Sequence, residues 1–373
     1  MHFYGILSHG ITPPVEIDGF ESFLKDFWWP LVEDQLTPEL IKAALRMSAL
    51  ELIESGVTSV SDILEAPKTV PGILKKEAEI IEELGLRAEL SIESSERVLD
   101  KFAKLALQEN IDFYKEFNEH ELISGKQCLH TTFTCSKEYI KKSFEMAKEA
   151  GAETQLHLSE SQYEVDYTLN EYGKRPVELY DELNVLSDDL LVSQAVKLNE
   201  NEIKLLKENG VRVAHLPISN CEVGGGVSPV PTMLKEDISV GLGTDGYVNN
   251  FFEVMRAAFL IHKVHHENPA VMPAPTVHKM ATSLGAKAIG FDNIGEIKKG
   301  NFADLITIDI ACPTPVNKDN LYEQLILFHN PENISEVIVN GKFVKENNKI
   351  KEYDMESIKK ETRKAAEKLW GDT

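Results

Sequence analysis

The sequence contains little cysteine and no long apolar run. Its four cysteines, in a chain of 373 residues, show no CxxC spacing, which argues against a zinc knuckle or a disulfide framework. No apolar stretch approaches the roughly 20 residues that a membrane-spanning helix needs. The first residues also lack the basic and apolar regions of a signal peptide. These absences predict a cytoplasmic protein in a reducing compartment, with no membrane partner.

Basic residues are outnumbered as well. The chain carries 39 Lys and Arg against 61 Asp and Glu, which gives a formal net charge of −22. Such an excess of negative charge repels polyanions, so no nucleic-acid partner is expected. No GxGxxG motif follows a first strand, which counts against a dinucleotide-binding fold.

Amphipathic segments alternate with short apolar runs along most of the chain. Helices are predicted, each ending at a glycine, at residues 38–56, 75–85, 136–151 and 200–210. Strands are predicted at residues 57–63, 87–93, 152–160, 189–196, 211–217 and 238–245. The repeated order of helix and then strand indicates a parallel sheet with crossover helices. Chain length favours an α/β fold of the (β/α)₈ TIM-barrel type over a doubly wound sheet.

The pattern changes near residue 300. Strands are predicted at 302–310 and 335–350, the second with a hairpin turn at Asn340-Gly341, and a helical segment follows. We therefore expect a barrel domain at residues 1–300, strands of a partial β-sandwich at 301–350 and a C-terminal helix at 351–373.

Polar residues recur where the predicted strands end, which is where a barrel carries its catalytic groups. They are His130, His157, Glu160, His215 and Asp245, and His2 stands at the start of the chain. Each alone is more often a structural residue than a ligand. Together, two imidazoles and a carboxylate suit a divalent ion such as Zn²⁺, which lowers the pKa of bound water towards 7. A nearby carboxylate, Glu160, would shuttle protons. The histidines at 262, 265 and 266 are interpreted as the polar, solvent-facing side of a helix.

Longer motifs resemble those of the amidohydrolase superfamily, and most closely its branch of S-adenosylhomocysteine and 5′-methylthioadenosine deaminases and related chlorohydrolases. The similar segments are HTTFTCS (130–136), QLHLSES (155–161), YGKRPVELYDEL (172–183), VAHLPISN (213–220), VGLGTDG (240–246) and MATSLGAKAIGFDNIGEIKKGNFADLITID (280–309). They extend over most of the chain. Their combination is specific, although each alone is weak. The HFYG and FWW segments are similar to those of a further aminohydrolase group in this branch.

The resemblance implies a metal-dependent TIM barrel with a composite β-sandwich. It implies one divalent ion, Zn²⁺ by default with Fe²⁺ or Mn²⁺ as alternatives, held by His2, His157 and Asp245. Metal-activated water would attack an aromatic carbon that bears an amino group, in a purine-type nucleoside or related small-molecule heterocycle, and release ammonia. By the same resemblance, Glu160 contacts the substrate and carries protons to the leaving amine, while His130 and Asn249 contact the substrate. A homo-oligomer is the expectation from the family.

Two departures leave the activity open. The family has a further metal-binding histidine two residues before His2, a position outside this chain, and the chain is expected to be an N-terminally truncated version of a longer protein with an incomplete first strand. Gln194 stands where the family has a histidine that activates water, and glutamine cannot accept a proton at neutral pH. The alternative to an active deaminase is a catalytically impaired relative that binds a ligand or a partner subunit.

Overall fold

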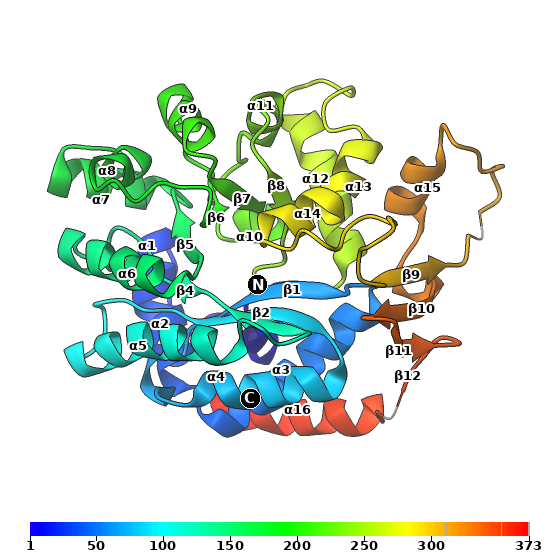
Figure 1. The fold of residues 1–373 in the computed structure, drawn as a ribbon, viewed down its shortest axis with the longest axis horizontal. Coiled ribbons are helices and arrows are strands. Elements are labelled where there is room, and N and C mark those ends of the chain that lie inside the picture. The colour runs from blue at the N-terminus through cyan, green and yellow to red at the C-terminus, as the bar shows by residue number, and fades with distance from the viewer. Residues whose placement is uncertain (311, 352, 372–373) are drawn as a thin grey trace.

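The computed structural model describes residues 1–310, 312–351 and 353–371, and parallel strands form its centre (Figure 1). The strands pair in the orders β1-β2-β3 and β4-β5-β6-β7-β8, and Lys126 alone separates β3 from β4. A parallel bridge between Ser94 and Leu129 continues the ladder from one sheet to the other. The strands are β1 Ser59–Leu64, β2 Arg87–Ile92, β3 Ile123–Gly125, β4 Gln127–Cys128, β5 Thr154–Leu158, β6 Leu190–Gln194, β7 Arg212–His215 and β8 Val240–Leu242.

The first residues of the chain lie along the free edge of β1. The terminal ammonium of Met1 donates to the Ser61 carbonyl at 2.8 Å, and the Ile63 amide donates to the Met1 carbonyl at 2.9 Å. The backbone of Met1 is therefore bonded to β1 as a neighbouring strand would be. His2 follows it at the carboxyl end of the barrel.

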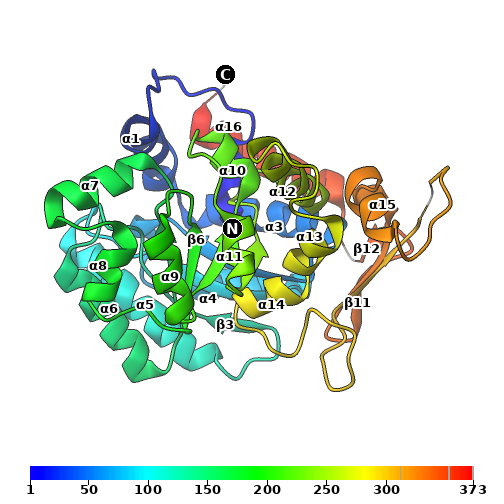
Figure 2. The same ribbon diagram turned by 90° about the horizontal axis from the view of Figure 1, so that it is seen from above.

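Helices surround this strand layer (Figure 2). The predicted helices at 38–56, 75–85, 136–151 and 200–210 are confirmed as α3, α4, α6 and α9. The helical segments are η1 Phe3–Ser8, α1 Phe20–Ser22, η2 Phe23–Trp28, α2 Trp29–Leu31, η3 Glu33–Gln35, α3 Pro38–Glu54, η4 Pro67–Thr69, α4 Ile73–Leu84, α5 Asp100–Phe117, α6 Lys137–Ala150, α7 Gln162–Tyr172, α8 Pro176–Glu182, α9 Glu200–Glu208, α10 Pro217–Glu222, α11 Val230–Lys235, α12 Phe251–His265, α13 Ala274–Ala281, α14 Ser283–Ala288, α15 Leu321–Phe328, η5 Pro331–Asn333 and α16 Met355–Trp370. The barrel-type α/β fold predicted from the helix-and-strand order is confirmed.

A small antiparallel sheet lies beside the barrel (Figure 1). Its order is β12-β11-β10-β9, with bounds β9 Leu305–Ile308, β10 Ile334–Val339, β11 Lys342–Glu346 and β12 Lys349–Ile350. Asn340 and Gly341 have φ values of 49° and 76°, as a tight hairpin turn requires, so that predicted turn is confirmed. Arg87 of β2 forms a buried ion pair with Asp304, with Nε 2.7 Å from Oδ2, which fixes the sheet to the barrel.

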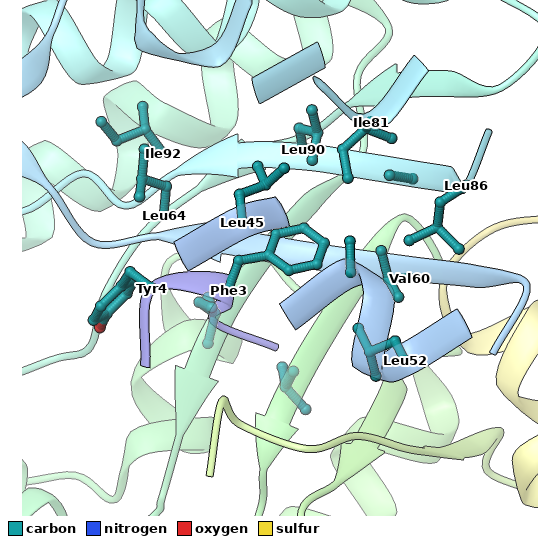
Figure 3. Close-up of a cluster of buried hydrophobic side chains, with 14 of the residues drawn as sticks. Phe3, Tyr4, Leu45, Leu52, Val60, Leu64, Ile81, Leu86, Leu90 and Ile92 are labelled. Atoms are coloured by element: carbon teal, nitrogen blue, oxygen red, sulfur yellow. The ribbon is translucent and has the colours of Figure 1, made fainter. Parts of the chain in front are cut away.

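The hydrophobic core joins the start of the chain to the barrel and to α3 and α4. Figure 3 shows Phe3 in one cluster with Leu45, Val60 and Leu90. The exposed fractions of these four side chains range from 0% to 6%. Full burial of such a side chain stabilises a fold by roughly 1.5–3 kcal/mol. The residue after His2 is thus anchored in the core, which restrains His2. Among the described residues, none of the helices has the length and apolarity to cross a membrane.

Candidate metal and catalytic site

His2 is held in one orientation at the carboxyl end of β1. Its Nδ1 lies 2.7 Å from the backbone carbonyl of Ile63, an acceptor, so Nδ1 carries the hydrogen. The other ring nitrogen, Nε2, lies 3.0 Å from Oδ1 of Asp245. His2 and Asp245 are far apart in sequence, and the fold brings them together as predicted.

Asp245 lies in a tight turn after β8. Its φ is 60° and that of Gly246 is 77°, and a Cβ atom on Gly246 would lie 2.5 Å from the His2 carbonyl oxygen. This close approach requires glycine and sets the distance between the two chain segments. The second carboxylate oxygen of Asp245, Oδ2, accepts hydrogen bonds from Ser219 Oγ and, at 3.3 Å, from Gln194 Nε2.

His157, on β5, is oriented by the same glutamine. Gln194 Nε2 donates to Asp245, so its Oε1 is the acceptor for His157 Nδ1 at 3.1 Å. That assignment leaves a lone pair on His157 Nε2. This atom is buried and has no hydrogen-bond partner among the described residues. A buried imidazole nitrogen that faces no hydrogen-bond donor is free to bind a metal ion. Gln194 therefore connects the two side chains in this structure.

Glu65, which the sequence analysis did not identify, directly follows β1. Its Oε1 lies 3.3 Å from His157 Nε2, and its Oε2 accepts a hydrogen bond from the hydroxyl of Tyr4. One donor atom from each of His2, Glu65 and His157 lies within 4.8 Å of the others. A lone carboxylate after a strand carries no spacing motif, so the sequence offered little signal for it.

The charges of these groups depend on one another. Burial disfavours the charged imidazole of His2, but Glu65 and Asp245 more than offset it and raise its pKa to about 9. Burial likewise opposes ionisation of Asp245, yet the hydrogen bond and charge of His2 lower its pKa to about 2. Burial is again outweighed at Glu65, whose pKa His2 and His157 hold well below its usual range. Both carboxylates are therefore ionised at neutral pH and suited to a cation.

Glu160 follows β5 and has the opposite character. Burial, and then the negative charge of Asp245, raise its pKa to about 8. It therefore keeps its proton near neutral pH, as a carboxyl group that donates a proton must.

His130 lies beside His157, with ring centroids 5.6 Å apart, and its Nδ1 bonds Thr134 Oγ1 at 2.8 Å. Two half-buried aromatic rings lie next to it. The ring centroids of Trp29 and Phe133 are 6.0 Å and 5.4 Å from that of His130. Burial and the neighbouring His157 hold the pKa of His130 well below its usual range, so it is neutral. A neutral imidazole beside aromatic faces is suited to a planar, uncharged ligand.

Two further residues lie apart from this group. Asn249, predicted to contact substrate, donates through Nδ2 to Glu51 of α3 at 2.9 Å, so the structure does not join it to the others. His215 is buried and its Nε2 lies 3.2 Å from that of His262. The interpretation of His262 as solvent-facing is therefore wrong, because the side of α12 that carries it packs onto β7; His265 and His266 are exposed.

A cavity of about 680 Å³ extends from these groups between β1 and β8. It is lined by His2, His157 and Asp245 at one end and by apolar side chains, among them Leu242 and Phe251, further along. The cavity size is that of a typical small-molecule site.

The sequence profile of the Amidohydrolase family matches residues 1–344. The chain belongs to the amidohydrolase family. Among curated members, the 5-methylthioadenosine/S-adenosylhomocysteine deaminase of Bacillus cytotoxicus is 34% identical over 357 residues, which are 92% of this chain and 80% of that protein. The 5'-deoxyadenosine deaminase of Methanopyrus kandleri is 31% identical over 353 residues, or 93% and 80% of the two chains.

Solved amidohydrolase-like structures share the fold. An adenosine deaminase from Xanthomonas campestris with bound zinc superposes with a TM-score of 0.89 at 22% identity, over 99% of this chain and 83% of that one. An atrazine chlorohydrolase from Arthrobacter aurescens, complexed with zinc, gives 0.86 at 21% identity, over 98% and 86%. The curated relatives confirm the predicted family and its deaminase branch, and the solved structures confirm the fold.

Proposed function

We propose that this amidohydrolase holds one divalent ion and uses it to remove the amino group from a purine-type nucleoside or a related heterocycle. One observation carries the proposal: His2 Nε2 lies 3.0 Å from Asp245 Oδ1, and one donor atom of His2 lies within 4.8 Å of one of His157, whose buried Nε2 has no hydrogen-bond partner among the described residues. When bound, a divalent ion supplies Lewis acidity that lowers the pKa of water towards 7. Zn²⁺ is the default, with Fe²⁺ or Mn²⁺ as alternatives.

The protein's own groups account for the remaining steps. His130, Trp29 and Phe133 offer a neutral imidazole and aromatic faces on which a flat heterocycle can lie. Glu160, with its pKa of about 8, holds the proton that the departing amine requires. Gln194 contacts a histidine and a carboxylate of the metal site, so we assign it a positioning role rather than the removal of a proton from water.

Ammonia release tests the proposal. The 373-residue chain, loaded separately with Zn²⁺, Mn²⁺ and Fe²⁺, is assayed with adenosine, methylthioadenosine, S-adenosylhomocysteine, guanine and a pterin. We expect ammonia from an adenine nucleoside. Release from guanine or a pterin alone would exclude the nucleoside and assign the related heterocycle as the substrate. Loaded protein that releases none from any of them would instead support the non-catalytic alternative.

The remaining expectations concern the setting of the protein. We infer a small-molecule substrate, a cytoplasmic location and a homo-oligomer, and these last two stay predictions.

A further inference from the structure

The four side chains of this site are His2, Glu65, His157 and Asp245. Each has one polar atom that is hydrogen-bonded to a supporting residue and a second polar atom that faces another member of the site. Glu65 follows this pattern. Its Oε2 accepts from the Tyr4 hydroxyl, which in turn accepts from Trp28 Nε1 at 3.2 Å, and its Oε1 faces His157 Nε2. The carboxylate is 6% exposed, so this orientation is imposed by packing and not by solvent.

The other three residues repeat the pattern. His2 is fixed through Nδ1, His157 through its Nδ1 contact with Gln194, and Asp245 through Oδ2. The atoms left over are two imidazole nitrogens and a carboxylate oxygen, to which Glu65 adds a second carboxylate oxygen. Metal-binding side chains are held in this manner, with the non-ligating atom bonded to a supporting group.

We propose that Glu65 is the fourth protein ligand of the ion, which makes the donor set two imidazoles and two carboxylates. The inference rests on the metal site of the proposed function and adds a ligand to it. His157 Nε2, 3.3 Å from Glu65 Oε1, and His2, within 4.8 Å, are close enough to share one ion with it. Asp245 joins the set through its 3.0 Å approach to His2.

A second carboxylate changes which ion the site prefers. The set carries two negative charges, which match the charge of a divalent ion in a buried site. Carboxylate oxygen favours harder ions such as Mn²⁺, whereas imidazole suits Zn²⁺ and Fe²⁺ alike. We therefore expect Glu65 to move the preference of the site towards Mn²⁺, relative to a set in which a histidine takes its place.

The neighbouring carboxyl of Glu93 offers a competing arrangement. Donor atoms of Glu65, Glu93 and His130 also lie within 4.8 Å of one another, and Glu93 Oε2 has no hydrogen-bond partner among the described residues. Glu65 belongs to both groups, whereas Glu93 is grouped only with Glu65 and His130, and His2 and His157 lie in the group without it. We therefore place the ion at Glu65, His2 and His157 and assign Glu93 no direct bond to it.

Metal binding by matched variants tests the assignment. Wild type, Glu65→Gln and Glu93→Gln are purified as the 373-residue chain and stripped with a chelator. Each is then titrated with Mn²⁺ and with Zn²⁺ by calorimetry, and bound metal is counted by mass spectrometry. We expect one ion per wild-type chain and a loss of affinity of at least about 100-fold in Glu65→Gln, since changes outside the ligand set already cost about 10–100-fold. Glu93→Gln should keep an affinity close to that of wild type, because Glu93 is not grouped with His2 or His157.

Two further measurements cover a variant that fails to fold. Glu65→His should keep the ion and raise the ratio of Zn²⁺ to Mn²⁺ affinity at least about tenfold above wild type. A crystal structure of the Mn²⁺-loaded wild type should place Glu65 Oε1 within about 2.2 Å of the ion. Wild-type affinity in a folded Glu65→Gln, an equal loss in Glu93→Gln, or an ion bound without Glu65 would each overturn the proposal.

The outcomes separate this inference from the function on which it rests. If wild type binds metal and deaminates, and Glu65→Gln binds metal equally well, only the role of Glu65 is refuted. Wild type that binds metal through Glu65 but releases no ammonia refutes the deaminase while the ligand stands. Wild type that binds no ion refutes both.

Discussion

Glu160 is the residue whose chemistry depends most on its surroundings. Burial and Asp245 keep it protonated near neutral pH, so we expect it to supply the proton for the leaving amine. Glu160→Gln should reduce ammonia release by about 10²–10⁴-fold, the usual range for removing a general acid. The measurement is kcat for the best substrate, with bound metal counted in the same samples.

The control for this variant is Glu171→Gln, which removes an exposed carboxylate from the far end of α7. It should leave kcat unchanged. Glu160→Gln with full metal content and wild-type kcat would exclude Glu160 as the proton donor.

Tyr4 allows a test of whether metal affinity depends on the hydrogen bond that orients Glu65. Its hydroxyl donates to Glu65 Oε2, so Tyr4→Phe leaves that oxygen without its partner and loosens the carboxylate. We expect metal affinity to fall by about 10–100-fold, which is typical for a group that orients a ligand. Tyr139→Phe removes a buried hydroxyl that donates to the Ala103 carbonyl at 2.8 Å, away from the site, and it should bind metal as wild type does. Equal affinity in both variants would show that the Tyr4 hydroxyl has no such role.

Single residues also show what the sequence could and could not predict. His157 and Asp245 lie inside motifs at predicted strand ends, which indicated a shared site, whereas His2 was assigned to it only through the resemblance to the family. Glu65 was not predictable, because a carboxylate after an apolar strand is indistinguishable in sequence from a solvated one. Its environment includes Tyr4 and Trp28, which are distant from Glu65 in sequence and reach it only through the tertiary fold.

Among the secondary-structure elements, the helices that end at a glycine and the apolar strands could be predicted from the sequence. The strands predicted at 57–63 and 87–93 correspond to β1 and β2 with boundaries shifted by one or two residues. The strand at 123–128 was missed because Lys126 interrupts it; that side chain is 0% exposed and is neutralised by Glu89 and Glu153 inside the barrel. A lysine at this position of the sequence predicts an exposed loop, since lysine is rarely buried unless it is paired.

The turn after β8 and the segment η1 form one unit whose contact depends on glycine. Gly246→Ala would introduce a Cβ atom 2.5 Å from the His2 carbonyl oxygen at a φ of 77°. We expect a loss of unfolding free energy of about 2–5 kcal/mol, from about 1–2 kcal/mol for the left-handed conformation and about 1–3 kcal/mol for overpacking. Urea denaturation measures it. The backbone displacement that relieves this contact also moves His2 away from Asp245, so metal affinity should fall as well.

Gly10→Ala is the matched control. Its φ of 74° is nearly the same, but nothing lies within 4 Å of the added Cβ atom. Only the conformational cost of about 1–2 kcal/mol should remain, and metal affinity should not change. A similar loss in both variants would mean that the contact between Gly246 and His2 imposes no constraint.

At the scale of the whole molecule, excess negative charge extends into the interior. The chain has a net charge of −22, and several carboxyl groups are buried, among them Glu89, Glu93 and Glu164. A stable fold tolerates this because burial keeps some of these groups protonated and lysine, arginine or a bound cation can neutralise others. Composition alone predicted the charge but not its position, which depends on which strand faces point inward.

Buried carboxyl groups should give this protein a stability that falls as pH rises. Burial raises the pKa of Glu164 to about 7, although Thr132 Oγ1 donates to its Oε1 at 3.0 Å. Between its unfolded pKa near 4.5 and about 7, the folded chain binds a proton that the unfolded chain has released. Unfolding free energy therefore decreases with pH across that window, by at most about 3.5 kcal/mol for this group at about 1.4 kcal/mol per unit.

Glu164→Gln isolates this contribution, because glutamine keeps the acceptor for Thr132 and does not ionise. Urea denaturation of wild type and variant at pH 5 and pH 8 should show the variant gaining stability relative to wild type at the higher pH. Glu79→Gln, an exposed position on α4, should show no such difference between the two pH values. If Glu164→Gln and wild type lose the same free energy between pH 5 and pH 8, then Glu164 is already ionised in the folded protein. In that case the hydrogen bonds from the Thr132 hydroxyl and the backbone of Ser159 and Glu160 outweigh the cost of burying its charge.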